Sequence, residues 1–298
     1  MILNFPPAFD VDFCRIAYPS IIKENDMLSE QFLTYAVNNG LITCSYMTRK
    51  LLVNFLYQNL NLAKSMNMLE IGPFDDPFLT GPNVKYFDIL DSDELKQEMI
   101  KTKHVTNKVP EKIDYVDSLG NLDIINEQFD IIFSSHVIEH QPNFIKHLNS
   151  VNRLLKDNGL YILFIPNKEY CFDYFQQLTD VASIIEANRI NQTLHSFRSI
   201  FNMHCNNTHN NPINHWKGIH GQVKCTIDNY QIAINVYNNS IENNKYVDVH
   251  EWYFTPANFF DIITKLNQLN LINLEIYRIC HTVQYFNEFL VILRKRVF

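Results

Sequence analysis

Glu70, Gly72 and Asp88 are the residues whose types and spacing first suggest chemistry. Glu70 and Gly72 close an apolar run that begins at Met68, and Asp88 closes the next apolar run. Glycine carries no Cβ and tolerates positive φ, so the backbone there can approach a ligand closely. A carboxylate offers two acceptor oxygens to the neighbouring hydroxyl donors of a ribose. The pattern therefore predicts a nucleoside-binding site at the ends of two strands.

A second group of polar residues follows the apolar run Phe129-Asp130-Ile131-Ile132-Phe133. Ser135 and His136 come directly after it, and α/β sheets bind ligands outside the carboxyl ends of their strands. His140 lies four residues beyond His136, so the two imidazoles would share one face of a helix. We expect His136 to contact a ligand and His140 to have a structural role.

The elements that must position these residues alternate between strand and helix. The expected strands end at Gly72 and Asp88 and then cover 112–117, 129–133, 160–166, 273–279 and 288–295. A helix over 144–155 is expected to end at Asp157-Asn158-Gly159, and a second helix covers 255–269. The last two strands are joined without a helix, which permits an antiparallel pair. The pattern predicts a doubly wound, mostly parallel, seven-stranded α/β sheet.

The chain divides into four segments on this pattern. Residues 1–66 are expected to form an extension of two helices packed on the core, and residues 67–166 the ligand-binding core. Residues 167–250 form a long insertion after the fifth strand, rich in His, Asn and aromatic residues. Residues 251–298 return to the core with the final helix and strand pair. The insertion is expected to be a lid or a small subdomain that covers a substrate.

Composition limits the classes of partner. The chain has 298 residues, 46% of them hydrophobic, and a net charge of −7. A negative charge disfavours nucleic acid, because binding to phosphates depends on Lys and Arg. We expect no apolar run long enough for a membrane span and no secretory signal, so a cytoplasmic location is the expectation. The six cysteines include no CxxC pair, so neither a disulfide framework nor a zinc ribbon is indicated.

Taken in chain order, the motifs of residues 66–168, and more loosely those of 250–298, resemble class I S-adenosylmethionine-dependent methyltransferases. They are Glu70-Ile71-Gly72-Pro73, Asp88, the segment Ser134-Ser135-His136-Val137-Ile138-Glu139-His140, and the turn Leu155-Lys156-Asp157-Asn158-Gly159. The chain departs from the fuller glycine motif of that family, because Phe74-Asp75-Asp76-Pro77 stands where further glycines would be. The resemblance implies a Rossmann-like methyltransferase fold and S-adenosylmethionine as the cofactor.

A narrower likeness concerns the segments on either side of the insertion. The variant Glu-Ile-Gly-Pro, residues 167–173 and residues 248–256 are similar to a subgroup of methyltransferases associated with the biosynthesis of bacterial surface polysaccharides. This likeness implies O-methylation of a sugar or nucleotide-sugar hydroxyl in capsule or lipopolysaccharide biosynthesis.

The resemblance also assigns expected roles to residues. The expected cofactor-binding residues are Glu70, Gly72, Pro73, Asp88, Asp117, Ser118, Leu119, Ser135 and His136. Asp88 is expected to accept both ribose hydroxyls, and Asp117 to Leu119 to meet the adenine. His136 is the first candidate for the base that accepts the proton of the acceptor hydroxyl, with His250 and His215 next. The alternative for His136 is a purely cofactor-packing role.

The acceptor is expected to lie under the insertion. Lys168, Tyr170, Trp216 and Trp252 are the expected substrate-binding residues, because aromatic faces and hydrogen-bonding groups suit a sugar ring. The insertion histidines have no tight ligand spacing, so no metal ligand is assigned, although a divalent ion is compatible with the chemistry.

Other functions stay open at this point. The chain could methylate another small molecule, act as an NAD(P)-dependent oxidoreductase with a degenerate glycine loop, or bind a nucleoside without catalysis. The final strand pair and the Ser-Ser-His-Val-Ile-Glu-His segment favour the methyltransferase over the oxidoreductase. A homo-oligomer is compatible with the sequence, and nucleic acid is not an expected partner.

Overall fold

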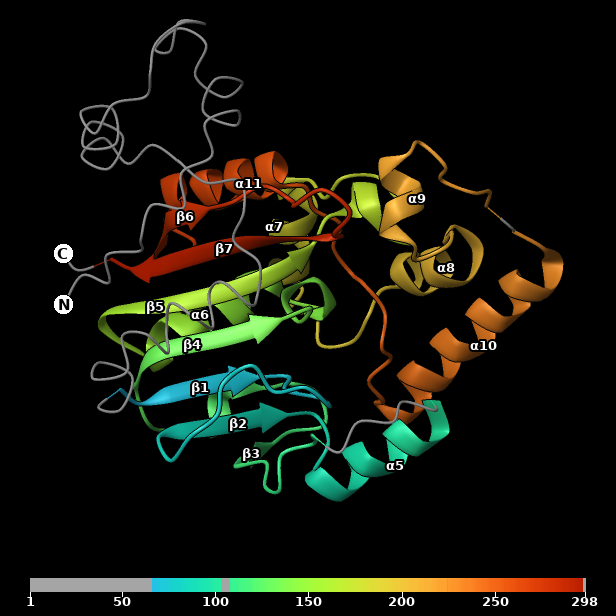
Figure 1. Cartoon of the computed structure of the whole chain (residues 1–298). Helices are drawn as coiled ribbons and strands as arrows, with labels where there is room; N and C mark the ends of the chain where they lie inside the picture. Colours follow the sequence, from blue (N-terminus) through green and yellow to red (C-terminus); the bar gives the residue numbers. More distant parts are fainter. Residues whose placement is uncertain (1–65, 103–107, 224, 297–298) are drawn as a thin grey trace, which may run out of the picture.

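The computed structural model describes residues 66–102, 108–223 and 225–296 (Figure 1). The two helices expected within residues 1–66 lie outside the described residues. Among the described residues, no helix combines the length and the apolar character that a membrane span requires.

A seven-stranded sheet forms the centre of the fold, with the strand order β3-β2-β1-β4-β5-β7-β6 (Figure 1). The strands are β1 (Met68–Ile71), β2 (Val84–Asp88), β3 (Tyr115–Val116), β4 (Phe129–Ser135), β5 (Leu155–Pro166), β6 (Leu274–Ile279) and β7 (Glu288–Lys295). The first five run parallel, and β7 is antiparallel to both β5 and β6. The predicted mostly parallel sheet with a final antiparallel pair is confirmed.

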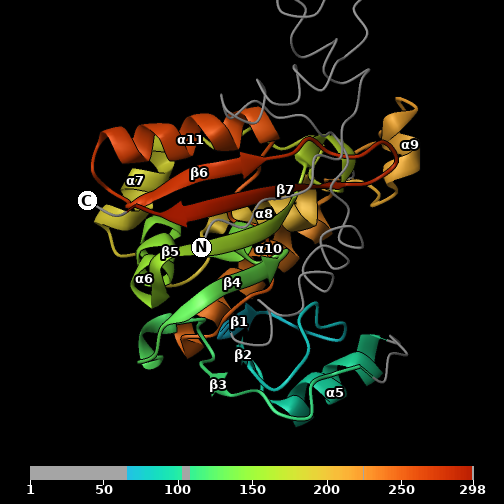
Figure 2. The same ribbon diagram turned by 60° about the vertical axis from the view of Figure 1, so that its left-hand side comes forward.

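The central strands are apolar on both faces, as expected for a sheet that is covered on both sides. In β5, Tyr161 and Leu163 belong to one buried cluster, whereas Ile162 and Phe164 belong to another. The first cluster includes side chains of α6, α7 and α11, and Figure 2 shows these three helices on the same face of the sheet. The alternation of side chains along each strand thus divides the core into two layers.

Helices surround the sheet and its carboxyl edge. The described α-helices are α5 (Ser92–Thr102), α6 (Phe144–Leu154), α7 (Val181–Arg189), α8 (Phe197–Cys205), α9 (Pro212–Trp216), α10 (Ile227–Asn243) and α11 (Pro256–Gln268). Short 3₁₀ helices are η1 (Leu122–Ile124), η2 (Ile138–His140) and η3 (Lys168–Tyr170). Side-chain caps define several starts: Asn143 accepts from Lys146 N at α6, and Thr255 from Asn258 N at α11.

Two strands differ by more than two residues from their predicted limits. The third strand covers only Tyr115–Val116. Before it, the Asp114 carboxylate and not a backbone carbonyl accepts Tyr86 N, and after it the Asp117 carboxylate accepts the backbone N–H groups of Leu119 and Asn121 and turns the chain. The fifth strand begins at Leu155, where α6 ends, and not after Gly159. Leu155 pairs with Phe129 and Leu160 pairs with Ile131, so residues 156–159 bulge out of the ladder. The predicted helix stop at Asp157-Asn158-Gly159 is therefore this bulge, in which Asn158 has φ 62°.

The insertion is helical. α8, α9 and α10 lie beyond the carboxyl ends of the parallel strands, at the right of Figure 1. α7 instead packs with α6 and α11 against the sheet, and its Ile184 and Ala187 are buried in the main core. The stretch from 190 to 250 is thus the part of the expected insertion that stands over the edge where ligands bind in such sheets.

Candidate functional site

Gly72 forms the turn at the carboxyl end of β1. Its φ of +70° lies in the left-handed region, and a Cβ at this position would lie 2.7 Å from Val137 Cγ2. Only glycine satisfies both conditions without strain. The close approach brings the turn after β1 against the segment after β4, so the two loops form one surface. Pro73 follows and is buried.

Replacing Gly72 by alanine should lower the free energy of unfolding by about 1–3 kcal/mol, the cost of a strained φ plus an overlap with Val137. Gly218→Ala is the matched control, because Gly218 has φ +75° but no atom within 4 Å of the added Cβ. Urea denaturation of both variants separates the overlap from the φ cost. Equal losses in the two variants would show that Val137 does not contribute.

Glu70 stabilises the loop that follows the glycine turn. Its carboxylate accepts the backbone N–H groups of Phe78 at 2.8 Å and Leu79 at 2.7 Å, and the residue is 3% exposed. Both oxygens of this predicted cofactor contact therefore bind the protein's own backbone. The structure gives Glu70 a positioning role toward the loop of residues 73–79.

Asp88 lies at the end of β2, beside the Gly72 turn. Gly72 N donates to Phe87 O, and Asp88 Oδ1 accepts from Ile89 N at 2.7 Å and Leu90 N at 3.3 Å. Burial raises the pKa of Asp88 to about 6, against the effect of these backbone hydrogen bonds. A buried carboxylate with a raised pKa is stabilised by any ligand that donates hydrogen bonds to its charged form.

The segment after β3 borders a cavity of about 190 Å³. Asp117 and Leu119, two of the three residues expected to meet adenine, line it together with Gln141 from the loop after β4. The carboxylate of Asp117 is engaged with backbone N–H groups, so the turn is fixed. The larger hollow of about 500 Å³ lies between α11 and β6, away from the carboxyl ends of the parallel strands.

His136 directly follows β4 and has a positive φ of 54°, which is rare for a residue with a Cβ. Its backbone N donates to Phe164 O, and its Nε2 lies 2.8 Å from Glu288 Oε2 at the start of β7. The side chain is 32% exposed. The hydroxyl of Ser135, the preceding residue, is buried and has no hydrogen-bond partner among the described residues. The strained backbone thus presents a histidine that a carboxylate orients.

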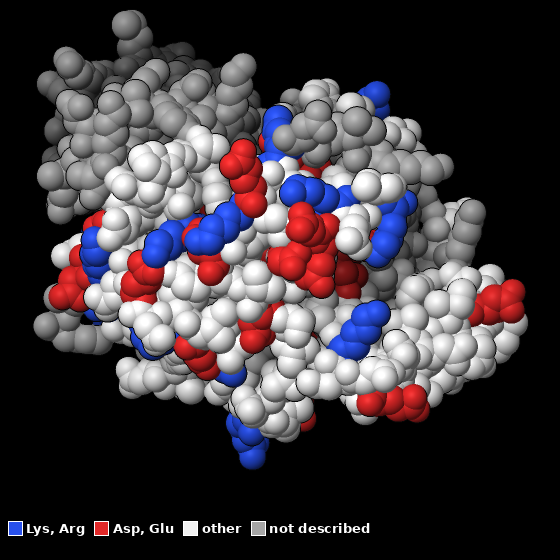
Figure 3. All heavy atoms as spheres, turned by 90° about the horizontal axis from the view of Figure 1, so that it is seen from below, with Lys and Arg blue, Asp and Glu red and all other residues white. Residues whose placement is uncertain are grey.

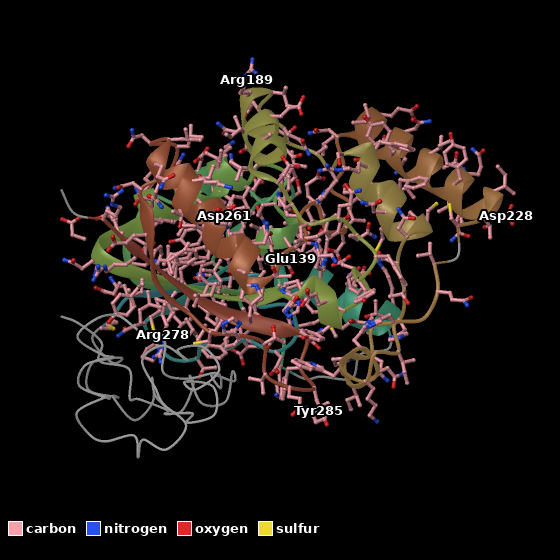
Figure 4. All side chains as sticks on the ribbon, turned by 90° about the horizontal axis from the view of Figure 1, so that it is seen from above. Glu139, Arg189, Asp228, Asp261, Arg278 and Tyr285 are labelled. Carbon is pink, nitrogen blue, oxygen red and sulfur yellow. The ribbon has the colours of Figure 1, made fainter. Side chains whose placement is uncertain are left out.

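Glu139 is the centre of a buried cluster behind His136. The residue is 0% exposed, and neither of its carboxylate oxygens has a hydrogen-bond partner among the described residues. Three imidazole nitrogens surround Oε1 beyond hydrogen-bonding distance: His136 Nδ1 and His140 Nε2 at 3.7 Å, and His250 Nε2 at 3.8 Å. Figure 4 shows Glu139 in the interior of the molecule.

Two further carboxylates lie beside Nδ1 of His250 and of His140, the ring nitrogens that do not face Glu139. His250 Nδ1 lies 2.5 Å from Asp173 Oδ2, and His140 Nδ1 lies 3.0 Å from Asp248 Oδ1. Burial lowers the pKa of His250, but the carboxylates of Asp173, Glu139 and Asp248 outweigh it and the pKa is raised. The His140 imidazole beside it lowers the pKa of Asp248. With Glu288 beside His136, the cluster therefore holds four carboxylates and three imidazoles.

The insertion contributes a segment that the sequence did not single out. Tyr246 and Asp248 follow α10, and the charges of Asp248, Glu139 and Asp88 all add to burial in raising the pKa of the Tyr246 hydroxyl. Tyr246 also packs edge-on against His195, with ring centroids 5.1 Å apart. The chain after α10 thus passes close to both Asp88 and the Glu139 cluster.

The predicted substrate-binding residues have three different environments. Tyr170 and Trp216 are half-buried and stack on each other, with ring centroids 3.9 Å apart and planes 4° apart. Trp252 is 1% exposed and donates its indole N–H to Gln141 O, so it packs in the core and offers no open face. Lys168 Nζ donates to Tyr174 O.

Two of the three base candidates are enclosed. His250 is 7% exposed and paired with Asp173 as described, and His215 is 2% exposed. His215 Nε2 lies 3.0 Å from His209 O, and its Nδ1 lies 3.0 Å from His220 Nδ1. His136 is the one candidate of the three with a substantial exposed fraction.

The sequence analysis assigned no role to Glu139, Asp173, Asp248 and Glu288, although Asp173 and Asp248 belong to the segments 167–173 and 248–256 that flank the insertion. Glu139 stood inside a quoted motif, between two histidines, and its charge in an otherwise apolar segment was the available indication. The partners Asp173, Asp248 and Glu288 come from distant parts of the chain, and no local spacing links them to the motif.

The fold and the loops at its carboxyl edge define a methyltransferase of the Rossmann-like type. The model of the methyltransferase domain family matches residues 44–215, more than half of the chain. The chain belongs to this family. A search of curated proteins finds no match.

Solved structures also resemble the chain. One is magnesium protoporphyrin IX methyltransferase from Synechocystis PCC 6803 with bound SAH, 11% identical, covering 96% of this chain and 97% of that chain at a TM-score of 0.39. Another is an S-adenosylmethionine-dependent methyltransferase from Clostridium acetobutylicum ATCC 824, 10% identical, covering 89% and 99% at a TM-score of 0.40.

Proposed function

We propose that the protein transfers the methyl group of S-adenosylmethionine to a hydroxyl group of a small molecule. The observation that carries the proposal is the pairing of the Gly72 turn with the buried carboxylate of Asp88 at adjacent strand ends. The turn provides the close backbone approach, and the carboxylate provides the acceptor that a ribose requires. Family membership supports the same class of reaction.

The residues present fit this cofactor. Asp88 would accept hydrogen bonds from the ribose, and the cavity lined by Asp117 and Leu119 would hold the adenine end. When bound, S-adenosylmethionine supplies an electrophilic methyl group on a positively charged sulfur. Glu70 contributes through the loop that its carboxylate holds.

His136 acts as the general base. Glu288 accepts the Nε2 proton, which leaves the lone pair on Nδ1. Nδ1 lies 3.7 Å from Glu139 Oε1, so the imidazole would turn about its Cβ–Cγ bond to accept the proton of the acceptor hydroxyl. The same hydrogen bond orients the ring and stabilises the imidazolium that forms. Holding the hydroxyl oxygen in line with the methyl group supplies much of the remaining acceleration.

We further propose that the acceptor is a sugar, carried on a nucleotide or in a cell-surface glycan, as in surface-polysaccharide biosynthesis. Two features support this class of acceptor. α8, α9 and α10 stand beyond the carboxyl ends of the parallel strands, and the stacked rings of Tyr170 and Trp216 provide a flat apolar platform there. Figure 3 shows acidic and basic side chains interspersed on the face seen from below, without a continuous basic surface of the kind that nucleic acid requires.

The test is a methyl-transfer assay with labelled S-adenosylmethionine and a panel of acceptors. Nucleotide-sugars and glycan fragments should accept the label, and Trp216→Ala should raise the KM for the acceptor with little change in the Kd for S-adenosylhomocysteine. Tyr230→Ala is the control, because Tyr230 is exposed on α10 and outside the stacked pair. Transfer only to a peptide, a quinone or an amine would refute the sugar and leave the methyltransferase standing.

The competing oxidoreductase is tested by calorimetry. Binding of S-adenosylhomocysteine without binding of NAD(P) is the expected result. Binding of NAD(P) alone would refute the cofactor assignment itself.

A further inference from the structure

The buried carboxylate of Glu139 needs a cation. A charged carboxylate without hydrogen-bond partners is costly in the interior of a protein, and native structures satisfy nearly all such groups. Glu139 is 0% exposed and both of its oxygens lack partners among the described residues. Its neighbours are imidazole nitrogens that lie too far away to donate hydrogen bonds to it.

The imidazoles of His140 and His250 are oriented to present lone pairs to this carboxylate. Asp173 Oδ2 lies 2.5 Å from His250 Nδ1 and Asp248 Oδ1 lies 3.0 Å from His140 Nδ1, so in its neutral form each ring is favoured with the proton on Nδ1 and the lone pair on Nε2. Both Nε2 atoms face Glu139 Oε1, at 3.7 and 3.8 Å. Acceptor atoms that face one another in a buried space repel, and a positive ion between them removes the repulsion.

The distances suit one shared ion. Ligand nitrogens and oxygens lie about 2.0–2.2 Å from a bound zinc ion, so two ligands of one ion are separated by up to about 4 Å. One ligand atom from each of Glu139, His140 and His250 lies within 4.8 Å of the others. To bind one ion, these three atoms would have to approach one another by up to about 1 Å.

We infer that Glu139, His140 and His250 bind a first-row divalent metal ion, with Asp173 and Asp248 orienting the two histidines from behind. Two imidazoles and one carboxylate suit Zn²⁺, Fe²⁺, Co²⁺ or Ni²⁺, whereas Mg²⁺ and Ca²⁺ prefer oxygen ligands. The cluster of three carboxylates and two imidazoles leaves a surplus of negative charge for the ion to balance, even with both imidazoles protonated. The inference does not rest on the identity of the acceptor.

A second group of histidines provides the contrast. His209, His215 and His220 also lie together in the insertion, but His215 Nδ1 and His220 Nδ1 already form a hydrogen bond and His215 Nε2 bonds to His209 O. Hydrogen bonds to one another and to the backbone already use these ring nitrogens, so they are not proposed as metal ligands. His220→Ala is therefore a matched control that removes a histidine without removing a proposed ligand.

The experiment measures metal binding directly. Untagged protein is treated with EDTA, dialysed and titrated with CoCl₂, whose visible ligand-field absorption reports nitrogen and oxygen coordination. The wild type and His220→Ala should bind one equivalent of Co²⁺, which Zn²⁺ displaces. Glu139→Gln and His250→Ala should lose this binding, and Asp173→Asn should weaken it about 10- to 100-fold.

Folding of the variants is checked by circular dichroism and thermal unfolding. Glu139→Gln keeps the shape of the side chain and removes a buried charge, so it should fold even if His250→Ala does not. Zn²⁺ should raise the melting temperature of the wild type and not that of Glu139→Gln, because an ion that binds only the folded state stabilises it. Absence of Co²⁺ binding in the wild type, or unchanged binding in Glu139→Gln, would overturn the inference. So would a loss of binding in His220→Ala.

Discussion

Replacing His136 by alanine should lower kcat about 10²- to 10⁴-fold, the usual contribution of a general base, and leave the Kd for S-adenosylhomocysteine nearly unchanged. The base acts on the acceptor hydroxyl in the transition state and not on the adenosine, so cofactor affinity does not depend on it. Radiometric turnover and calorimetry of the same protein sample measure the two quantities.

Glu288→Gln is the companion variant. Glutamine at this position no longer stabilises the imidazolium that forms during the reaction, so turnover should fall by less than in His136→Ala. His220→Ala removes a histidine of the insertion and should retain full turnover. Unchanged turnover in His136→Ala would show that the proton goes elsewhere, and the cofactor site would remain as described.

The sheet could be predicted because each of its main strands is a continuous apolar run in the sequence. The apolar runs before Gly72, Asp88 and Ser135 form β1, β2 and β4 at the expected places. The limits of β3 and β5 could not be predicted, because they depend on interactions beyond the run itself. The Asp117 turn ends β3 early, and the pairing of Leu155 with Phe129 begins β5 before its bulge.

The loops at the carboxyl edge were only partly predictable. The positions of Gly72, Asp88 and His136 could be predicted because each residue lies at the end of a strand, and a strand end is visible in the local sequence. The burial of Glu139 and its relation to Asp173 and His250 follow from the folding of the insertion back onto η2, where Glu139 O accepts from Glu251 N and Trp252 N. That contact joins residues far apart in the sequence. It also explains why Trp252, expected against a substrate, lies in the core.

Asp88→Asn should weaken the binding of S-adenosylhomocysteine about 10- to 100-fold, because it removes the charge from an acceptor whose hydrogen bonds are worth about 1.5–3 kcal/mol. Asp91→Asn is the matched control: Asp91 is exposed and caps α5, and asparagine caps a helix as well. Affinity of the wild type should fall as the pH drops below about 6, where Asp88 takes up a proton. Asp88→Asn should lose this pH dependence.

Ionisation of Asp88 should favour cofactor binding but destabilise the ligand-free folded protein. The pKa of Asp88 is about 6 in the folded protein, against 3.8 for an ordinary aspartate in an unfolded chain, so the folded protein binds more protons between these values. Stability of the ligand-free wild type therefore falls as the pH rises from about 4 to 6, by roughly 3 kcal/mol for a shift of about two pH units. Asp88→Asn stays neutral and should not show this loss. Urea denaturation at pH 4, 5, 6 and 7 compares the two proteins, and a variant that is less stable than the wild type at pH 7 but binds S-adenosylhomocysteine equally well would refute the role given to this carboxylate.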